Sequence, residues 1–150
     1  MKIAITFFLI LSILILQAQE TPKPAIKSNS LSISAGSVFV LHSFSGYYEH
    51  SFVRFEKITF TVRTGFIKTY FPTDDGTDNM IPAQVGIITG KRKNHFEAYV
   101  GGMVVLDNIS NRLWPSLSLG YRWQSSESNF IFRAGVALPE MLYIGIGVAF

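Results

Sequence analysis

Hydroxyl, imidazole and carboxylate side chains, the three groups of a serine hydrolase, occur close together between residues 42 and 51. The group comprises His42, Ser43, Glu49, His50 and Ser51. A histidine and an acid can activate a serine hydroxyl as a nucleophile, so these residue types would suit a lipid-hydrolysing site. No nucleophile elbow or oxyanion feature accompanies them, and we expect no catalytic residue in this segment. The sequence therefore favours a protein that is not an enzyme.

A second group of candidate ligands lies in the segment 73–79, where Asp74, Asp75 and Asp78 supply the carboxylate oxygens that calcium prefers. The segment lacks the twelve-residue spacing and the final glutamate of an EF-hand loop, so a solvated turn is predicted instead of a metal site. His95 stands alone in its segment and is predicted to be structural, neither a ligand nor a general base. No metal and no other cofactor is expected.

The composition indicates a single domain with an unusually apolar surface. The chain has 150 residues, of which 15% are charged and 14% are aromatic, and its mean hydropathy is positive, which is uncommon for a soluble domain. The lack of cysteine excludes a disulfide framework, a thiolate metal site and lipid attachment through cysteine. The net charge is only +3 and the basic residues are dispersed, so nucleic acid is not an expected partner.

The first eighteen residues have the features of a targeting segment. Lys2 provides a positive start, an apolar run follows from Ile3 to Leu16, and Ala18 ends a tolerable cleavage site. The run is shorter than the roughly 20 residues of a membrane-spanning helix, which argues against the alternative of an N-terminal anchor. We therefore expect a cleavable signal peptide at 1–18, a poorly ordered periplasmic lead-in at 19–30 and one domain at 31–150.

From Leu31 onward, apolar residues recur at every second position, the period of a strand with two different faces. The final segment shows this best, because its apolar residues share one face while Tyr143, Gly145 and Gly147 share the other. Eight strands are predicted in all, at about 31–41, 47–56, 58–70, 80–89, 94–107, 117–124, 129–138 and 142–150.

Two barrel types fit eight such strands, and they differ in which face points inward. A soluble barrel of the lipocalin kind would place its apolar face inside. Here the polar face is rich in Gly, Ser and Thr, which suits the crowded interior of an eight-stranded barrel better than a water-exposed surface. The sequence therefore predicts an all-β fold, an eight-stranded antiparallel up-and-down transmembrane β-barrel with its apolar face toward lipid.

The same alternation predicts an ionic network inside the barrel. Placing each strand charge by its position in the alternation brings six residues to the inner face: Arg54, Glu56, Arg63, Glu97, Arg122 and Arg133. Lone charges there would be costly, so we expect Glu97 to pair with arginines on the two following strands. Paired charges with trapped water would plug the lumen. The alternative is that the arginines line a hydrated, anion-selective channel.

The predicted connections place aromatic residues near both rims. Outer connections are expected at 42–46, 71–79, 108–112 and 138–140, and inner turns near Lys57, at 91–94 and at 125–128. Aromatic residues that flank them would form an interfacial girdle. Those expected toward the outer rim are Tyr47, Tyr48, Tyr70, Phe71 and Trp114, and those toward the inner rim are Phe55, Phe96, Trp123 and Phe130.

From about Leu31 to Phe150 the chain resembles the small outer-membrane β-barrel proteins of Gram-negative bacteria, such as the OmpX-like and OmpA-like barrels. The most specific part is the C-terminal strand, whose alternating apolar residues and terminal aromatic resemble the signal read by the barrel-assembly machinery: Leu142, Ile144, Ile146, Val148 and Phe150. The segments 119–124 and 132–136 also resemble this class, in which they carry no catalytic assignment.

The resemblance implies a location and a set of partners. It implies the outer membrane, contact with outer-membrane lipid and lipopolysaccharide, transient contact with the assembly machinery, and a monomer. The short predicted outer connections argue against an adhesive role. Three functions stay open at this point: a structural or envelope-stabilising barrel with a plugged lumen, a narrow pore or small-ligand-binding barrel, and a lipid-modifying enzyme. We expect the first.

Overall fold

The computed structural model describes residues 26–38, 41–71, 76–91, 93–106 and 112–150. The expected signal peptide and residues 19–25 of the expected lead-in lie outside these ranges. In the described part of the chain every regular element is a strand, and no helix there is long and apolar enough to cross a membrane.

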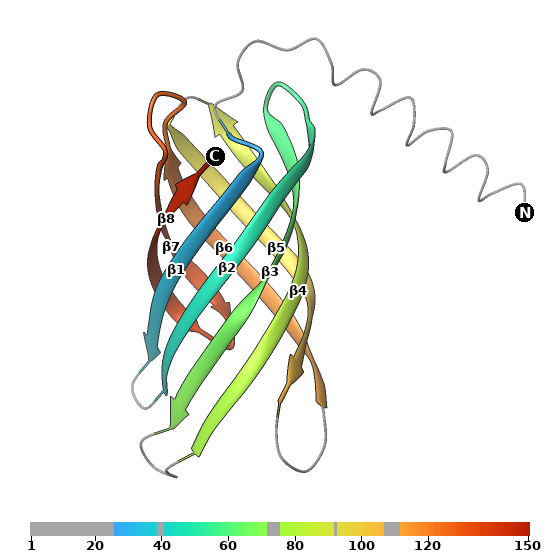
Figure 1. Ribbon diagram of the computed structural model, residues 1–150, viewed down its shortest axis with the longest axis vertical. Helices are drawn as coiled ribbons and strands as arrows, with labels where there is room; N and C mark the ends of the chain where they lie inside the picture. Colours follow the sequence, from blue (N-terminus) through green and yellow to red (C-terminus); the bar gives the residue numbers. More distant parts are fainter. Residues whose placement is uncertain (1–25, 39–40, 72–75, 92, 107–111) are drawn as a thin grey trace, which may run out of the picture.

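Eight antiparallel strands form one closed barrel, as predicted (Figure 1). Each strand pairs with the next along the chain, and β8 closes the barrel by pairing with β1. The strands are β1 (Asn29–Val38), β2 (Leu41–Arg54), β3 (Ile58–Phe71), β4 (Gly76–Lys91), β5 (Asn94–Val105), β6 (Arg112–Gln124), β7 (Phe130–Leu138) and β8 (Met141–Ala149).

The boundaries at the outer end, where the β1–β2 and β7–β8 connections lie, differ from those predicted. Residues 42–46 were expected to form a connection, but they belong to β2; likewise, residues 76–79 of the expected connection 71–79 belong to β4, and the last residue of the expected connection 108–112 begins β6. The cause is visible in β2, where Ser43 and Ser45 are buried in the barrel and Phe44 between them is exposed. Small polar residues that resemble a turn in the sequence are therefore interior residues of a long strand.

The two faces of the barrel have the predicted orientation. Large apolar side chains from every strand are exposed on the outer wall, among them Ile33, Val100 and Ile144, which are 64%, 54% and 56% exposed. Buried polar and charged residues alternate with them and line the interior. The lipocalin-like alternative, with an apolar interior, is therefore wrong.

Glycines on the inner face make room for large interior side chains. A Cβ atom on Gly86 would lie 2.2 Å from the Tyr99 ring, and one on Gly120 would lie 2.3 Å from the Tyr143 hydroxyl. Since such distances are impossible for real atoms, these two positions require glycine for the tyrosines to occupy the lumen. The glycine-rich inner face is thus explained by the packing of aromatic residues against it.

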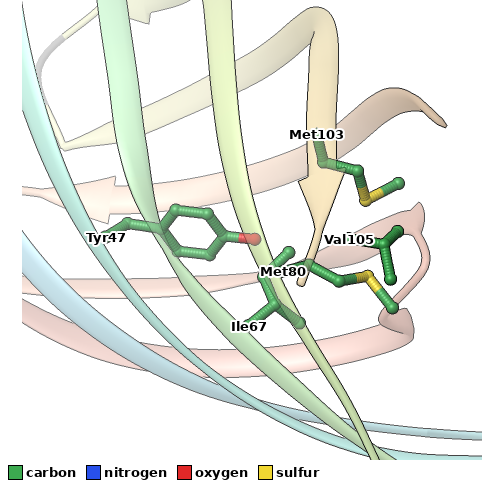
Figure 2. Packing of buried hydrophobic residues seen from close by; sticks show 5 residues of the cluster. All are labelled: Tyr47, Ile67, Met80, Met103 and Val105. Atoms are coloured by element: carbon green, nitrogen blue, oxygen red, sulfur yellow. The ribbon is translucent and has the colours of Figure 1, made fainter. Parts of the chain in front are cut away.

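A small apolar cluster occupies the interior toward the outer rim. It consists of Tyr47, Ile67, Met80, Met103 and Val105, which come from β2, β3, β4 and β5 (Figure 2). All five side chains are at most 9% exposed. This outer part of the lumen is therefore filled by packed apolar atoms on the side of β2 to β5.

The two ends of the barrel wall, Asn29 and Phe150, lie at the inner rim, the end of the barrel opposite the β1–β2 and β7–β8 connections. The amide of Asn29 donates to the carbonyl oxygen of Phe150 at 2.9 Å, and the amide of Phe150 donates to the carbonyl oxygen of Asn29 at 2.9 Å. These reciprocal bonds complete the closure between β1 and β8, and they leave no open strand edge at this seam.

Candidate functional site

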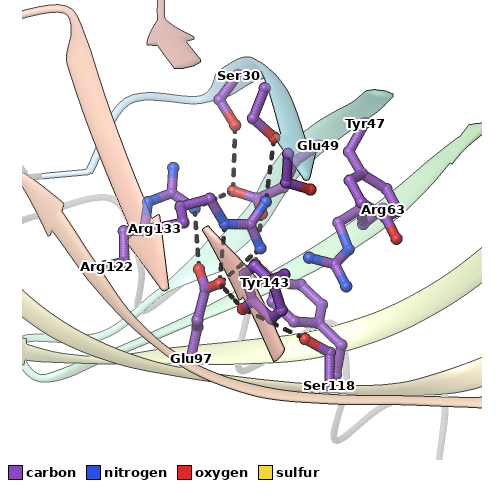
Figure 3. Close-up of polar contacts among 12 residues, drawn as sticks. Ser30, Tyr47, Glu49, Arg63, Glu97, Ser118, Arg122, Arg133 and Tyr143 are labelled. Carbon is purple, nitrogen blue, oxygen red and sulfur yellow. Dashed lines mark hydrogen bonds and ion pairs between the residues drawn. The ribbon is translucent and has the colours of Figure 1, made fainter. Parts of the chain in front are cut away.

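Two arginines and two glutamates form the centre of the lumen (Figure 3). Arg122 and Arg133 are direct cross-strand partners in β6 and β7, so their like charges would repel. Glu97 of β5 accepts hydrogen bonds from Arg133 Nη2 at 2.6 Å and from Arg133 Nε at 2.8 Å. Glu49 of β2 accepts one from Arg122 Nη1 at 2.6 Å. Each guanidinium therefore has a carboxylate partner.

The central charges are almost fully excluded from solvent. The side chains of Glu49, Glu97, Arg122 and Arg133 are between 0% and 3% exposed. Arg122 Nη1 also lies 3.8 Å from the second oxygen of Glu97, which links the two ion pairs. Removing one member of a buried pair leaves an uncompensated charge, so these contacts hold four strands in a fixed arrangement.

Each buried carboxylate also accepts a hydrogen bond from a tyrosine hydroxyl. Tyr99 donates to Glu49, and Tyr143 donates to Glu97 at 3.1 Å. A third carboxylate, that of Glu140, accepts from Tyr47 at 2.6 Å. The aromatic rings bring apolar bulk into the lumen, while their hydroxyls donate hydrogen bonds to the buried carboxylates.

Arg63 connects the central network to the apolar cluster. Its guanidinium carbon lies 3.8 Å from the centroid of the Tyr99 ring and 4.3 Å from that of the Tyr47 ring, within cation–π range. Its Nε donates to Gln84 at 2.7 Å, and Gln84 donates in turn to Ser116 at 2.7 Å. Polar contacts therefore continue from β3 across β4 to β6.

Glu140 closes the lumen at the outer rim. It belongs to the turn between β7 and β8, yet it is only 2% exposed because its side chain enters the barrel. Ser34 of β1 donates to it at 3.2 Å, and Ser45 and Tyr47 of β2 donate as well. The next residue, Met141, has a φ of 61°, a conformation that costs free energy in a non-glycine residue. The Glu140 contacts hold this turn against the strands on the other side of the seam.

We expect Glu140→Ala to lower the free energy of unfolding by about 1–3 kcal/mol, because the buried Tyr47 hydroxyl loses its acceptor and the Ser34 and Ser45 hydroxyls keep only their bond to each other. Denaturant unfolding followed by tryptophan fluorescence would measure it. Glu127→Ala is the matched control, since Glu127 is exposed in the β6–β7 turn. Equal stability of the two variants would show that the Glu140 contacts do not stabilise the barrel.

The residues that precede β1 lie against the inner end of β2. Ile26 is 5% exposed, the carbonyl of Ser28 accepts a hydrogen bond from the Ser51 amide at 2.7 Å, and Arg54 Nη2 donates to the Ser28 hydroxyl at 2.8 Å. Residues 26–28 had been assigned to a poorly ordered lead-in. They instead pack against the inner end of β2.

Two of the six residues expected in the ionic network lie outside it. The structure places Arg63, Glu97, Arg122 and Arg133 in the lumen, but Arg54 is half-buried at the inner rim against Ser28, and Glu56 is exposed in the β2–β3 turn. The reason is their position at the end of the strand, because Arg54 is the last residue of β2 and a side chain there lies at the rim of the barrel and not in its middle. The strand ends two residues before Glu56.

Sequence reasoning missed Glu49 and Glu140 as lumen residues. Glu49 had been grouped with the serines and histidines of the hydrolase alternative, although it lies in the same alternation as Ser43, Ser45 and Ser51. That alternation was a usable signal. Glu140 lies in a turn, where no strand period applies, and only the folded structure shows its direction.

The hydrolase group is not assembled in the structure. Ser43, Glu49 and Ser51 are buried in the lumen, whereas His42 and His50 are exposed on the other face of β2. His42 is bonded to Ser37 at 3.0 Å and His50 to Asn29 at 2.8 Å. His95 is 3% exposed inside the barrel. Strand alternation therefore separates these histidines of β2 from its serines.

The described residues include no group of three or more His, Cys, Asp or Glu side chains that could hold a metal ion. Of the acidic segment considered for calcium, Asp74 and Asp75 lie outside the described residues, and Asp78 is part of β4. No protein-family model matches the chain, and neither does any curated protein. Among the described side chains, Arg122 and Arg133 neutralise the buried carboxylates of Glu49 and Glu97.

Proposed function

We propose that this chain is an outer-membrane β-barrel of a Gram-negative bacterium, with a plugged lumen and a structural or envelope-associated role. The observation that carries the proposal is the distribution of side chains, with apolar residues outside and charged residues inside, which is the reverse of that in a soluble barrel. Apolar residues such as Leu142, Ile144 and Ile146 are 59%, 56% and 49% exposed on the outer wall, while ion pairs fill the interior. A closed barrel also satisfies its backbone groups internally, which is the requirement for a strand protein in lipid.

The partners follow from the same surface. The apolar wall would contact outer-membrane lipid and lipopolysaccharide, and the C-terminal strand would be recognised by the barrel-assembly machinery after cleavage of the signal peptide. A monomer is sufficient, because the barrel closes on itself without a second chain. The filled lumen favours a structural role over a pore, and the separation of serines from histidines in β2 disfavours hydrolysis. Neither catalytic residues nor cofactors are part of the proposal.

Cell fractionation combined with gel mobility before and after heating tests the proposal. The protein is expected in the outer-membrane fraction and is expected to migrate differently when the folded barrel is not boiled. Recovery from the soluble periplasm would contradict the membrane location. Planar-bilayer recordings test the plugged lumen separately, since a filled barrel should show no steady conductance.

Deletion of Phe150 is expected to reduce barrel insertion much more than deletion of one residue from the segment 19–25. Phe150 makes both reciprocal main-chain bonds to Asn29 and is 56% exposed at the inner rim, where it would be available for recognition. The measurement is the yield of the heat-modifiable form in outer membranes. Equal yields from the two deletions would contradict a special role for the terminal aromatic.

A further inference from the structure

A groove with a volume of about 760 Å³ lies on the outer wall over β8, β1, β2 and β3, and the first residue of β7 adjoins it. Six of the side chains that form its apolar walls are Leu31, Ile33, Phe66, Phe130, Ile146 and Val148. The volume falls within the range of about 300–1,000 Å³ that is typical of small-molecule sites. This is therefore one of several concave apolar regions on the outer wall, and a larger one of about 970 Å³ lies nearer the outer rim, beside Phe44, Tyr70 and Leu142.

The groove exists because Gly46 faces outward. Most other glycines of the barrel are crowded by neighbouring atoms, but a Cβ atom on Gly46 would meet nothing within 4 Å. A second hollow of about 580 Å³ shares Ile33, Gly46 and Ile146 with the first and extends it toward Ala35 and Ile144. Together the two hollows make an elongated apolar channel alongside β1.

Polar groups lie at the inner-rim end of the channel. The Tyr48 hydroxyl and His50 Nδ1 both bond to Asn29 Oδ1, at 2.9 Å and 2.8 Å. The ammonium group of Lys27 donates to Asn129 Oδ1, and Asn129 precedes Phe130, which lines the groove. Lys27, which precedes β1, therefore reaches across the inner end of β8 to the residue before β7, where the lining residue Phe130 begins. The one carboxylate in the adjoining β6–β7 turn, Glu127, is exposed.

We propose that this channel binds an anionic phospholipid, with one acyl chain along β1 over Gly46 and the phosphate beside Lys27. An apolar channel with a cationic and hydroxyl-bearing end complements a molecule that joins a phosphate to hydrocarbon chains. The tyrosine and histidine add hydrogen-bonding groups at the depth where a headgroup meets the hydrocarbon. The inference rests on the proposed membrane location and deepens it by naming a particular lipid site.

The fluorescence of Trp123 can report lipid binding at this site, because Trp123 lies beside the groove. Its ring centroid lies 6.1 Å from that of Phe130, which lines the groove. The sequence has two tryptophans, so Trp114→Phe leaves Trp123 as the only one. Acyl chains that carry bromine quench tryptophan fluorescence on contact. The relative binding of two lipids near Trp123 can therefore be measured in phosphatidylcholine vesicles that contain brominated phosphatidylglycerol or brominated phosphatidylcholine.

In the Trp114→Phe background we expect phosphatidylglycerol to be preferred over phosphatidylcholine by about fivefold, the effect of one lysine at an anionic lipid surface. Lys27→Gln should abolish most of this preference. Lys57→Gln is its control, because Lys57 is exposed in the β2–β3 turn of the same rim but does not adjoin the groove. It should keep the preference.

Gly46→Leu should weaken quenching by either lipid, because a Cβ atom at this position meets nothing within 4 Å and the leucine side chain would extend into the channel. Its control is Ala83→Leu on the exposed face of β4. If Lys27→Gln keeps the lipid preference as Lys57→Gln does, and Gly46→Leu changes quenching no more than Ala83→Leu does, the proposed lipid site is wrong. The proposal of a membrane barrel is not affected by that result. If no brominated lipid quenches Trp123 and no heat-modifiable form is obtained in vesicles, the proposed membrane location itself fails.

Discussion

Replacing Glu97 with Gln is expected to lower the free energy of unfolding by about 3–5 kcal/mol, because it breaks a buried ion pair and leaves a charge uncompensated. Glu97 accepts two hydrogen bonds from Arg133 and lies 3.8 Å from Arg122. In the variant, the amide oxygen at position 97 can still accept a hydrogen bond, but the negative charge that faced Arg133 is lost, and the Ser32 hydroxyl at 3.1 Å from Arg133 cannot replace it. Freed arginine side chains would also loosen the filled lumen, so conductance should rise.

Two further variants make the Glu97 test specific. Glu56→Gln is the matched control, because Glu56 is exposed in the β2–β3 turn and its loss should change stability by less than about 0.5 kcal/mol. Combining Glu97→Gln with Arg133→Gln should recover part of the lost stability, since the double variant removes both charges. The measurements are urea unfolding in vesicles and planar-bilayer conductance. If Glu97→Gln left both as they are in the parent, the buried network would not stabilise the barrel.

The second large effect is expected on the outer wall, where Ile146→Arg or Val136→Arg should cost about 2–4 kcal/mol if these positions lie near the midplane of a bilayer. Both side chains face outward and are 49% and 48% exposed. An arginine there would have to enter hydrocarbon, whereas on a water-facing wall it would be harmless. This prediction therefore tests the environment of the wall as well as its orientation.

Leu113→Arg provides the depth control for the wall variants. Leu113 is 79% exposed near the outer end of β6, where the cost of arginine should fall to about 0–1 kcal/mol. The free energy of unfolding from lipid vesicles is the quantity to compare. Arginine tolerated equally at Ile146, Val136 and Leu113 would contradict immersion of the wall in lipid.

Strand alternation predicted most of the fold, because a period of two residues indicates both that a segment is a strand and which of its side chains share a face. In β7 and β8 the apolar residues on the outer wall are those predicted, and Arg122 and Arg133 point inward as the period requires. The period has no information about where a strand begins when its first residues are small and polar. This is why the start of β2, with Ser43, Ser45 and Gly46, was assigned to a connection.

The interior network could be predicted only in part, for two physical reasons. Arg54 is the last residue of β2 and Glu56 lies in the turn after it, so the alternation that was used to place them in the lumen does not extend to their positions. Contacts made by a turn depend on its backbone path, so the partners of Glu140 could not be read from spacing. The tyrosines of the lumen follow the period correctly, but their role as donors to carboxylates requires the three-dimensional structure.

The reciprocal bonds between Asn29 and Phe150 place the two ends of the barrel wall one strand spacing apart at the same rim. A linker of a few residues could join them, and the chain could then be opened at another inner turn, for instance beside Lys93 between β4 and β5. Such a circular permutant would keep every strand neighbour while β8 became an internal strand. Comparing this permutant with the parent chain would distinguish two roles of β8. One is its contribution to the barrel wall, and the other is its recognition as the C-terminal strand during assembly.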